Sequence, residues 1–65
     1  MYNYVVYFNG YGANRVIYRQ QKITLNVRHN WNQSPEEAAN VMFLAQQKIK
    51  EHFTRFKITS IEQLG

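Results

Sequence analysis

The chain has no cysteine, no aspartate and only one proline among its 65 residues. Without cysteine it cannot form disulfides or cysteine-based zinc sites. A chain this short buries only about 60% of the surface that its unfolded form exposes, so we expect a stability of about 3–5 kcal/mol. Packing, or association with another copy, must supply that stability.

Long hydrophobic runs are also missing. The longest, Val41 to Ala45, is far too short to span a bilayer, and no secretory hydrophobic segment follows Met1. The composition shows no internal repeat, low-complexity block or linker. We therefore expect one domain over residues 1–65, soluble and located in the cytoplasm of a host cell.

Acidic residues are scarce, and the charge balance is basic. Eight Lys and Arg residues against four Glu give a formal charge of +4. This density of positive charge favours an anionic partner, either a nucleic acid or an acidic protein surface, and predicts salt-dependent binding.

Groups suited to catalysis are few. Glu36 and Glu37 are adjacent on a predicted helix, so their side chains diverge. His29 and His52 have no acidic or thiol neighbours in the sequence, and the pattern pairs no nucleophile with a base. We predict no enzyme activity, no catalytic residue, no metal site and no cofactor.

The clearest pattern in the chain runs from Ser34 to Phe56 and predicts a helix. Ser34 suits the N-cap, Pro35 suits the first helical position, and Glu37 is placed to complete a capping box. Apolar residues recur at intervals of three and four, which predicts one core-facing stripe. This stripe comprises Ala38, Met42, Ala45, Ile49, Phe53 and Phe56.

The segments around this helix favour strands. Tyr2–Phe8 is rich in aromatic and β-branched residues, with apolar residues on both faces, as in a central strand. Residues 9–14 predict a turn because Asn9-Gly10 is a strong hairpin signal. Residues 15–28 form one bent strand or two, and Lys57–Ile61 forms a short closing strand.

Within residues 15–28, Ile23, Leu25 and Val27 are expected to face the core. The predicted fold is α+β: a small antiparallel sheet of three or four strands with one helix packed on one face. Two or three strands precede the helix and one follows it.

Basic and aromatic residues alternate in the strand region. Single-stranded nucleic acid is bound by such a combination of charge and stacking rings. The alternative is a solvated sheet face whose Tyr rings are only half packed. The residues that would form the binding face are Tyr7 or Tyr2, together with Arg15, Tyr18, Arg19, Lys22 and Arg28.

Three further apolar residues are unusually placed. On a helical wheel Phe43 and Leu44 lie far from the core stripe, beside Lys50, and Trp31 lies on a polar loop. Either the N-terminal segment or the Trp31 loop folds over one of these two helix residues, or they form a surface for a partner or for self-association. Trp31 is either a lid over the core or an anchor for a partner.

From these patterns we predict a non-enzymatic binding module. The first hypothesis is an accessory regulator or inhibitor, of the kind encoded by phages and mobile elements, that occludes a surface of a host protein or nucleoprotein complex. The alternative is a protein that binds single-stranded nucleic acid on its sheet face. A third is a homodimeric structural protein. The predicted partner-binding residues are Tyr7, Arg15, Tyr18, Arg19, Lys22, Arg28, Trp31, Phe43, Leu44 and Lys50.

Overall fold

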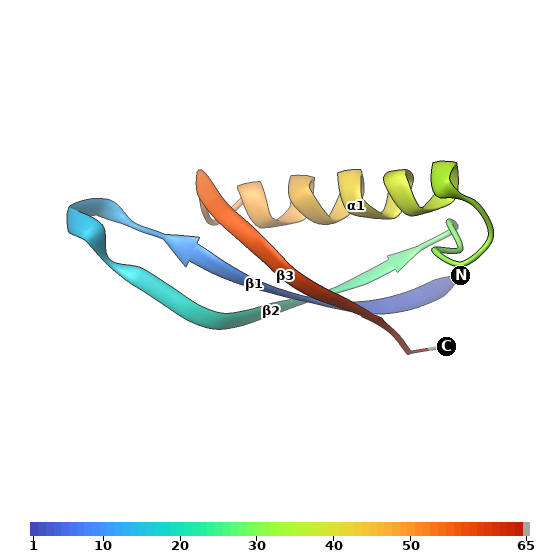
Figure 1. Cartoon of the computed structure of the whole chain (residues 1–65), viewed down its shortest axis with the longest axis horizontal. Helices are drawn as coiled ribbons and strands as arrows, with labels where there is room; N and C mark the ends of the chain where they lie inside the picture. The colour runs from blue at the N-terminus through green and yellow to red at the C-terminus, as the bar shows by residue number, and fades with distance from the viewer. Residues whose placement is uncertain (65) are drawn as a thin grey trace.

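The fold is a three-stranded antiparallel sheet with one helix, seen in a computed structural model that describes residues 1–64 (Figure 1). The strands lie in the order β2-β1-β3, so the first strand is central. This confirms the predicted α+β class. The elements are β1 (Tyr2–Tyr11), β2 (Ile17–Val27), α1 (Pro35–Lys50) and β3 (Arg55–Gln63), with a 3₁₀ turn at Ala13–Arg15.

Strand β1 carries the centre of the core on one of its faces. Tyr4, Val6 and Phe8 are 0%, 0% and 3% exposed, as expected for alternate residues of a strand covered on one side. From β2, Leu25 is buried against them, while Ile23 and Val27 pack at the margin. The predicted core-facing residues of β2 are therefore confirmed.

Helix α1 starts where the sequence predicts and ends earlier. Ser34 is the N-cap, and its Oγ accepts a hydrogen bond from the Glu37 backbone N–H at 3.1 Å. The last helical residue is Lys50, six residues before Phe56. No glycine follows as a stop signal, and the chain instead leaves the helix to pair as β3 with β1.

The predicted apolar stripe was therefore partly wrong. The buried helix residues are Val41, Ala45 and Ile49. Phe53 lies between the helix and β3, and Phe56 lies in β3, although both pack against the core. The predicted stripe treated these two residues as helical and omitted Val41.

Gly10 is a strand residue and not part of the turn, which corrects the prediction from Asn9-Gly10. Gly10 is buried in β1, and a Cβ added there would overlap the ring of Phe53. That ring also packs edge-on against Phe8, with centroids 5.6 Å apart. Glycine is required here for close packing, so the local turn signal is overridden by tertiary structure.

The turn itself is displaced along the chain to residues 12–16. The Gly12 N–H donates to the Val16 carbonyl at 2.9 Å, and Asn14 and Arg15 have positive φ values of 58° and 60°. After it, β2 is a single strand with an irregularity at Gln20, whose φ is 57°. This resolves the choice between one strand and two: β2 is one strand with a bulge at Gln20.

The closing strand is longer than predicted. β3 pairs with β1 from Arg55 opposite Tyr11 to Gln63 opposite Tyr4. Polar residues at both ends conceal its length in the sequence, because an edge strand with one open face needs apolar residues only at alternate positions.

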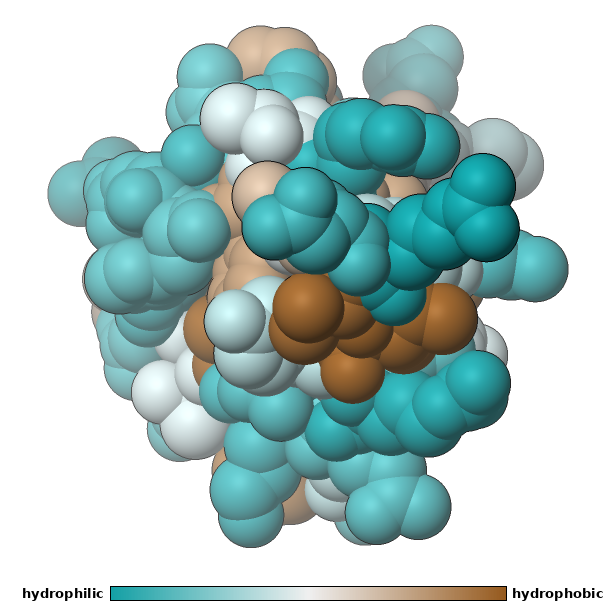
Figure 2. Space-filling view, turned by 90° about the vertical axis from the view of Figure 1, so that its left-hand side faces the viewer, coloured by the Kyte–Doolittle hydropathy of each residue, from teal (hydrophilic) through white to brown (hydrophobic). Residues whose placement is uncertain are grey.

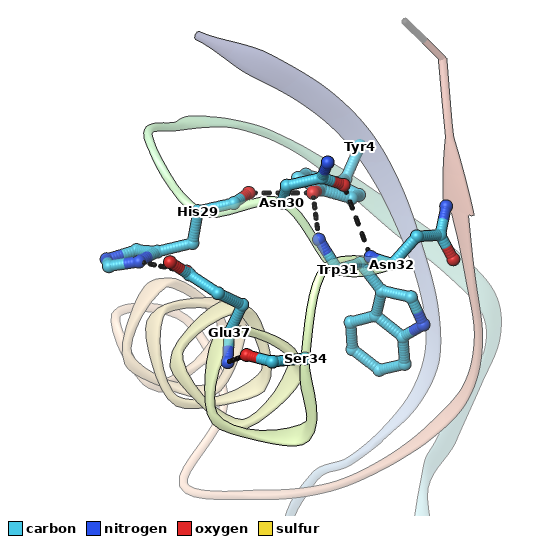
Figure 3. A network of polar contacts seen from close by, with 7 residues as sticks. All are labelled: Tyr4, His29, Asn30, Trp31, Asn32, Ser34 and Glu37. Carbon is cyan, nitrogen blue, oxygen red and sulfur yellow. Dashed lines mark hydrogen bonds and ion pairs between the residues drawn. The ribbon is translucent and has the colours of Figure 1, made fainter.

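The loop between β2 and α1 is tied to the core by the hydroxyl of Tyr4 (Figure 3). This hydroxyl donates to the His29 carbonyl at 2.7 Å and accepts from the Trp31 backbone N–H at 2.8 Å. The Trp31 side chain is half-buried against the core, which favours its interpretation as a lid. A buried Tyr hydroxyl with both partners satisfied fixes this loop at little cost.

The same loop corrects two expectations about Glu37 and His29. The Glu37 carboxylate lies 2.6 Å from the Nδ1 atom of His29 (Figure 3). His29 therefore has an acidic neighbour in space, although it has none in sequence. A capping box would also have the Glu37 carboxylate accept a hydrogen bond from the Ser34 backbone N–H. Glu37 contacts the His29 ring instead, so only the hydrogen bond to the Ser34 hydroxyl is formed.

The molecule is elongated, with extents of 40 × 18 × 16 Å. The β1–β2 hairpin extends past the C-terminal end of α1 (Figure 1). Within residues 1–64, no helix has the length and apolar character needed to cross a membrane.

Candidate binding face

The side of the sheet away from α1 is open to solvent. We call it the open face, and assign it from the alternation of β1 and from the residues paired with it, because directly paired residues share a face. A side-chain hydrogen bond from Asn26 to Asn3 agrees with this assignment. The open face comprises Asn3, Val5, Tyr7, Asn9 and Tyr11 of β1, Ile17, Lys22, Thr24 and Asn26 of β2, and Arg55, Lys57, Ser60 and Glu62 of β3.

Two β-bulges flank the middle of this face, one in each outer strand. In β2, Arg19 and Gln20 together lie opposite Asn9. In β3, Thr59 is the extra residue between Ser60, which pairs with Tyr7, and Ile58. Bulges bend a strand and redirect its side chains, and they are enriched beside functional sites.

Both bulges are held by side-chain hydrogen bonds to or from β1. The Gln20 backbone N–H donates to Asn9 Oδ1 at 3.2 Å, and Thr59 Oγ1 donates to the Tyr7 carbonyl at 3.1 Å. The backbone of Gln20, with its positive φ, is therefore fixed by Asn9. These contacts give the middle of the open face a defined shape.

Between the bulges the surface is hollowed. The lining contains two cations, one aromatic ring, hydroxyl and amide groups, and no acidic residue. We call this the central hollow; it is lined by Tyr7, Asn9, Arg19, Gln20, Lys22, Thr59 and Ser60. Such a lining can hold an anion by charge and by hydrogen bonds while presenting a ring for stacking.

The charges of the molecule are separated along its length. The half that contains the hairpin, the helix C-terminus and the start of β3 holds every Lys and Arg except Arg28, but only one Glu, Glu51. Glu36 and Glu37 lie at the helix start, and Glu62 lies near the other end of β3. The positive end includes the central hollow, so the field of the protein draws anions toward it.

The structure brings together three of the predicted partner-binding residues. Tyr7, Arg19 and Lys22 all line the central hollow. They come from neighbouring strands, and Lys22 pairs directly with Tyr7.

The remaining members of the predicted basic–aromatic face are elsewhere. Tyr18 pairs with Gly10 on the covered side of the sheet, and its ring lies 5.5 Å from that of Phe53. Arg15 lies in the hairpin loop and Arg28 follows the end of β2. The bulge at Arg19–Gln20 explains why Tyr18 lies on the covered side, because one extra residue reverses the face on which the residues before it lie.

The residues predicted from the helix and its loop separate in the same way. Phe43 is 57% exposed, as the helical wheel predicts, and Lys50 is exposed at the helix end. Leu44 was wrongly placed: it packs against the margin of the core. The observed buried stripe is centred on Val41 and Ala45, so Leu44 lies at its margin. The predicted stripe was centred on a different side of the helix, which placed Leu44 away from the core.

Sequence reasoning missed four residues of the central hollow: Asn9, Gln20, Thr59 and Ser60. Asn9 was assigned to the turn, and Thr59 depends on the register between β1 and β3, which no local pattern encodes. A detectable signal was the Gln20-Gln21 pair, which interrupts the strand pattern and indicates a bulge or a bend.

Other clusters of ionisable groups are small. Within the described residues, no three His, Asp or Glu side chains are placed to hold a metal ion.

Comparison with known proteins gave no match to the chain among family models, curated proteins or solved structures.

Proposed function

We propose that this protein is a non-enzymatic module that binds single-stranded nucleic acid across the open face. The observation that carries the proposal is the central hollow, where Arg19 and Lys22 lie with the ring of Tyr7 on one solvent-exposed surface. Arg19 and Lys22 would contact backbone phosphates, and Tyr7 would stack on a base.

The chemistry of the open face favours a nucleic acid over a protein. Protein interfaces generally have an apolar, desolvated centre surrounded by polar residues. Here the centre is polar and cationic, and the aliphatic side chains assigned to the face among the described residues are Val5 and, at the hairpin end, Ile17. Asn, Thr and Ser side chains beside the cations supply hydrogen bonds to phosphate, sugar or base edges.

A single strand fits this surface better than a duplex. A strand with unstacked bases can place a base on Tyr7, whereas the bases of a duplex are stacked on each other. Direct contact with phosphates requires only charge and hydrogen bonds, so little sequence preference is expected. The cytoplasmic location expected from the sequence is part of the proposal.

Fluorescence anisotropy with a labelled single-stranded oligonucleotide tests the proposal. We expect submicromolar binding at physiological salt, with log K falling by about 0.7 per phosphate contact for each log unit of salt. Arg19→Glu with Lys22→Glu should abolish most binding and reduce that salt slope. Tyr7→Ala should weaken binding by about 5- to 150-fold, corresponding to the loss of one stacked base.

Lys50→Glu provides a matched control, because it reverses an exposed charge at the helix end and away from the open face. It should change affinity much less than Lys22→Glu alone. The proposal is wrong if the wild type binds no more tightly than about 10⁻⁴–10⁻⁶ M, the usual non-specific range. Equal losses from Lys50→Glu and Lys22→Glu would also contradict it, because net charge alone would then explain binding.

A second candidate, occlusion of a host protein or nucleoprotein surface, is favoured by the hairpin end. Figure 2, which views the molecule from that end, shows an apolar area within a mainly hydrophilic surface. Val16, Ile17 and Tyr18 follow the hairpin loop and are 44%, 45% and 47% exposed. Aromatic residues flanked by Arg are typical of protein-binding hot spots.

Affinity purification from host cells distinguishes this candidate. A specific protein partner should be retained by the wild type and by Arg19→Glu with Lys22→Glu, and lost with Ile17→Lys. If Ile17→Lys retains every protein that the wild type retains, the hairpin end is not a binding surface.

A further inference from the structure

The two outer edges of the sheet differ in how far side chains cover their backbone groups. On β2, the Lys48 ammonium group donates a hydrogen bond to the Thr24 carbonyl, and the Gln21 side chain donates to the Arg19 carbonyl. Along β3, within the described residues, no side chain makes such a bond to the strand backbone. An uncovered edge strand has unpaired N–H and C=O groups that can pair with another strand.

The β3 edge also exposes part of the core. Ile58 and Ile61 are only half-buried, and they line a shallow groove with Trp31 and Met42. Helix α1 makes more contact with β2 than with β3, so the core is less covered on this side. Another strand along β3 would cover these side chains.

The sequence of β3 is complementary to itself. With Thr59 set aside as the bulged residue, Ile58 and Ile61 are the positions on either side of Ser60 on the covered face. Lys57 and Glu62 are the next positions outward, on the open face, and they have opposite charges. An antiparallel copy of β3 centred on Ser60 would therefore meet the same pattern in reverse.

We propose that β3 pairs with β3 of a second copy of this chain, antiparallel, around a two-fold axis at Ser60. In this register Ile58 lies opposite Ile61 of the second copy, and Lys57 lies opposite Glu62 of the second copy. The axis repeats each pair, giving two apolar and two oppositely charged cross-strand pairs.

The charges and the bulge on β3 also restrict what can pair with it. An edge strand with a charge on each half and an extra residue in the middle is a poor match for an arbitrary strand. A two-fold copy is the exception, because it places each Lys beside a Glu, while each bulge lies next to the axis and opposite the unbulged half of the other strand. The edge thus excludes other strands while accepting a second copy.

Pairing of this kind joins the two sheets into one, with β3 strands at the centre. Because the axis is perpendicular to the sheet, both open faces lie on the same side and both helices on the other. The inference does not depend on the proposed function: although Ser60 also lines the central hollow, the pairing uses the outer backbone edge of β3 and is tested without nucleic acid.

Light scattering after size-exclusion chromatography, without nucleic acid, gives the first test. The wild type should have twice the 7.8 kDa mass of the chain at micromolar concentrations. Lys57→Glu or Glu62→Lys should raise the dimer dissociation constant by about tenfold or more, because both charge pairs become repulsive. The double variant with the two charges exchanged should restore the dimer.

Cross-linking gives the second test, since the chain has no cysteine of its own. Ser60→Cys places two thiols at the axis, within the Cα separation that a disulfide requires. Oxidation should convert it to a covalent dimer much faster than Thr24→Cys, an exposed control on β2.

A wild type that is monomeric at high micromolar concentration overturns the proposal. So does a dimer whose mass is unchanged by either charge reversal and whose Ser60→Cys variant cross-links no faster than the control. Failure of the exchanged-charge variant to restore the dimer, with circular dichroism showing a folded chain, would contradict the Ser60 register.

Discussion

The two faces of β1 differ completely although their residues alternate along one strand. Tyr4, Val6 and Phe8 are buried under the helix, whereas Val5 and Tyr7 lie between them on the open face. The covered face is filled with apolar side chains and the open face has polar and cationic neighbours. The residues that form the core and the residues proposed to bind are therefore separated by direction within a single strand.

This separation predicts how substitutions behave. Changes on the covered face should lower the free energy of unfolding without changing the affinity of the molecules that remain folded. Changes on the open face should alter affinity, with stability within about 0.5 kcal/mol of the wild type. Substitutions at the bulges should affect both stability and affinity, because the bulges set both the packing of β3 and the position of Arg19.

The largest effect is expected from Ile49→Ala. Ile49 is fully buried in α1 beneath the covered face, so its truncation leaves a cavity and should cost about 2–5 kcal/mol. In a domain of this size that is enough to unfold a large fraction of molecules. Thermal and urea denaturation measure it, and wild-type stability in this variant would contradict the assignment of the core.

Gly10→Ala should have the next largest effect. The added methyl group overlaps the ring of Phe53, which is also packed against Phe8, so the ring must move. We expect a loss of about 1–3 kcal/mol, typical of an overpacked site.

Gly12→Ala is the matched control for Gly10→Ala. The nearest atom to its Cβ is in the ring of Tyr18 at 3.0 Å, and that side chain is 47% exposed and can shift. If urea denaturation shows equal losses from both substitutions, the overlap with the Phe53 ring is not what requires glycine at position 10.

Gly10 also shows where sequence reasoning reached its limit. Asn9-Gly10 has the local chemistry of a hairpin turn, but the decisive contact is with Phe53, more than forty residues later in the chain. The start of the helix was predicted correctly because its signal is local: Ser34 caps the third residue after it. Elements defined by local contacts were predictable, and those defined by long-range packing were not.

The candidate site follows the same rule. Tyr7 and Lys22 were predicted as binding residues from the alternation of basic and aromatic residues, and strand pairing brings them together. Tyr18 was misplaced because the bulge at Gln20 shifts the register, and Thr59 was missed for the same reason in β3. A shift of one residue reverses the face of every later side chain, so a site on a sheet depends on knowing each bulge.

Ser34→Ala tests how far the covered face depends on the start of the helix. Its Oγ accepts the Glu37 N–H, so the substitution should cost about 1 kcal/mol. Ser34→Asp, which keeps a capping oxygen, should retain most of that stability. Melting curves measure both, and identical curves for Ser34→Ala and wild type would show that the cap contributes nothing.

The smallest effect is expected from Phe43→Lys, which probes a surface outside both faces of β1. Phe43 is 57% exposed on α1, and its helix neighbours Val41 and Ala45 already fill the core beneath. The substitution should therefore change stability by no more than about 0.5 kcal/mol, and it should leave oligonucleotide affinity and dimer mass unchanged. Denaturation, anisotropy and light scattering on one preparation check all three. A dimer that becomes a monomer would move the interface from β3 to the helix, because only a contact through Phe43 gives that result while the sheet remains folded.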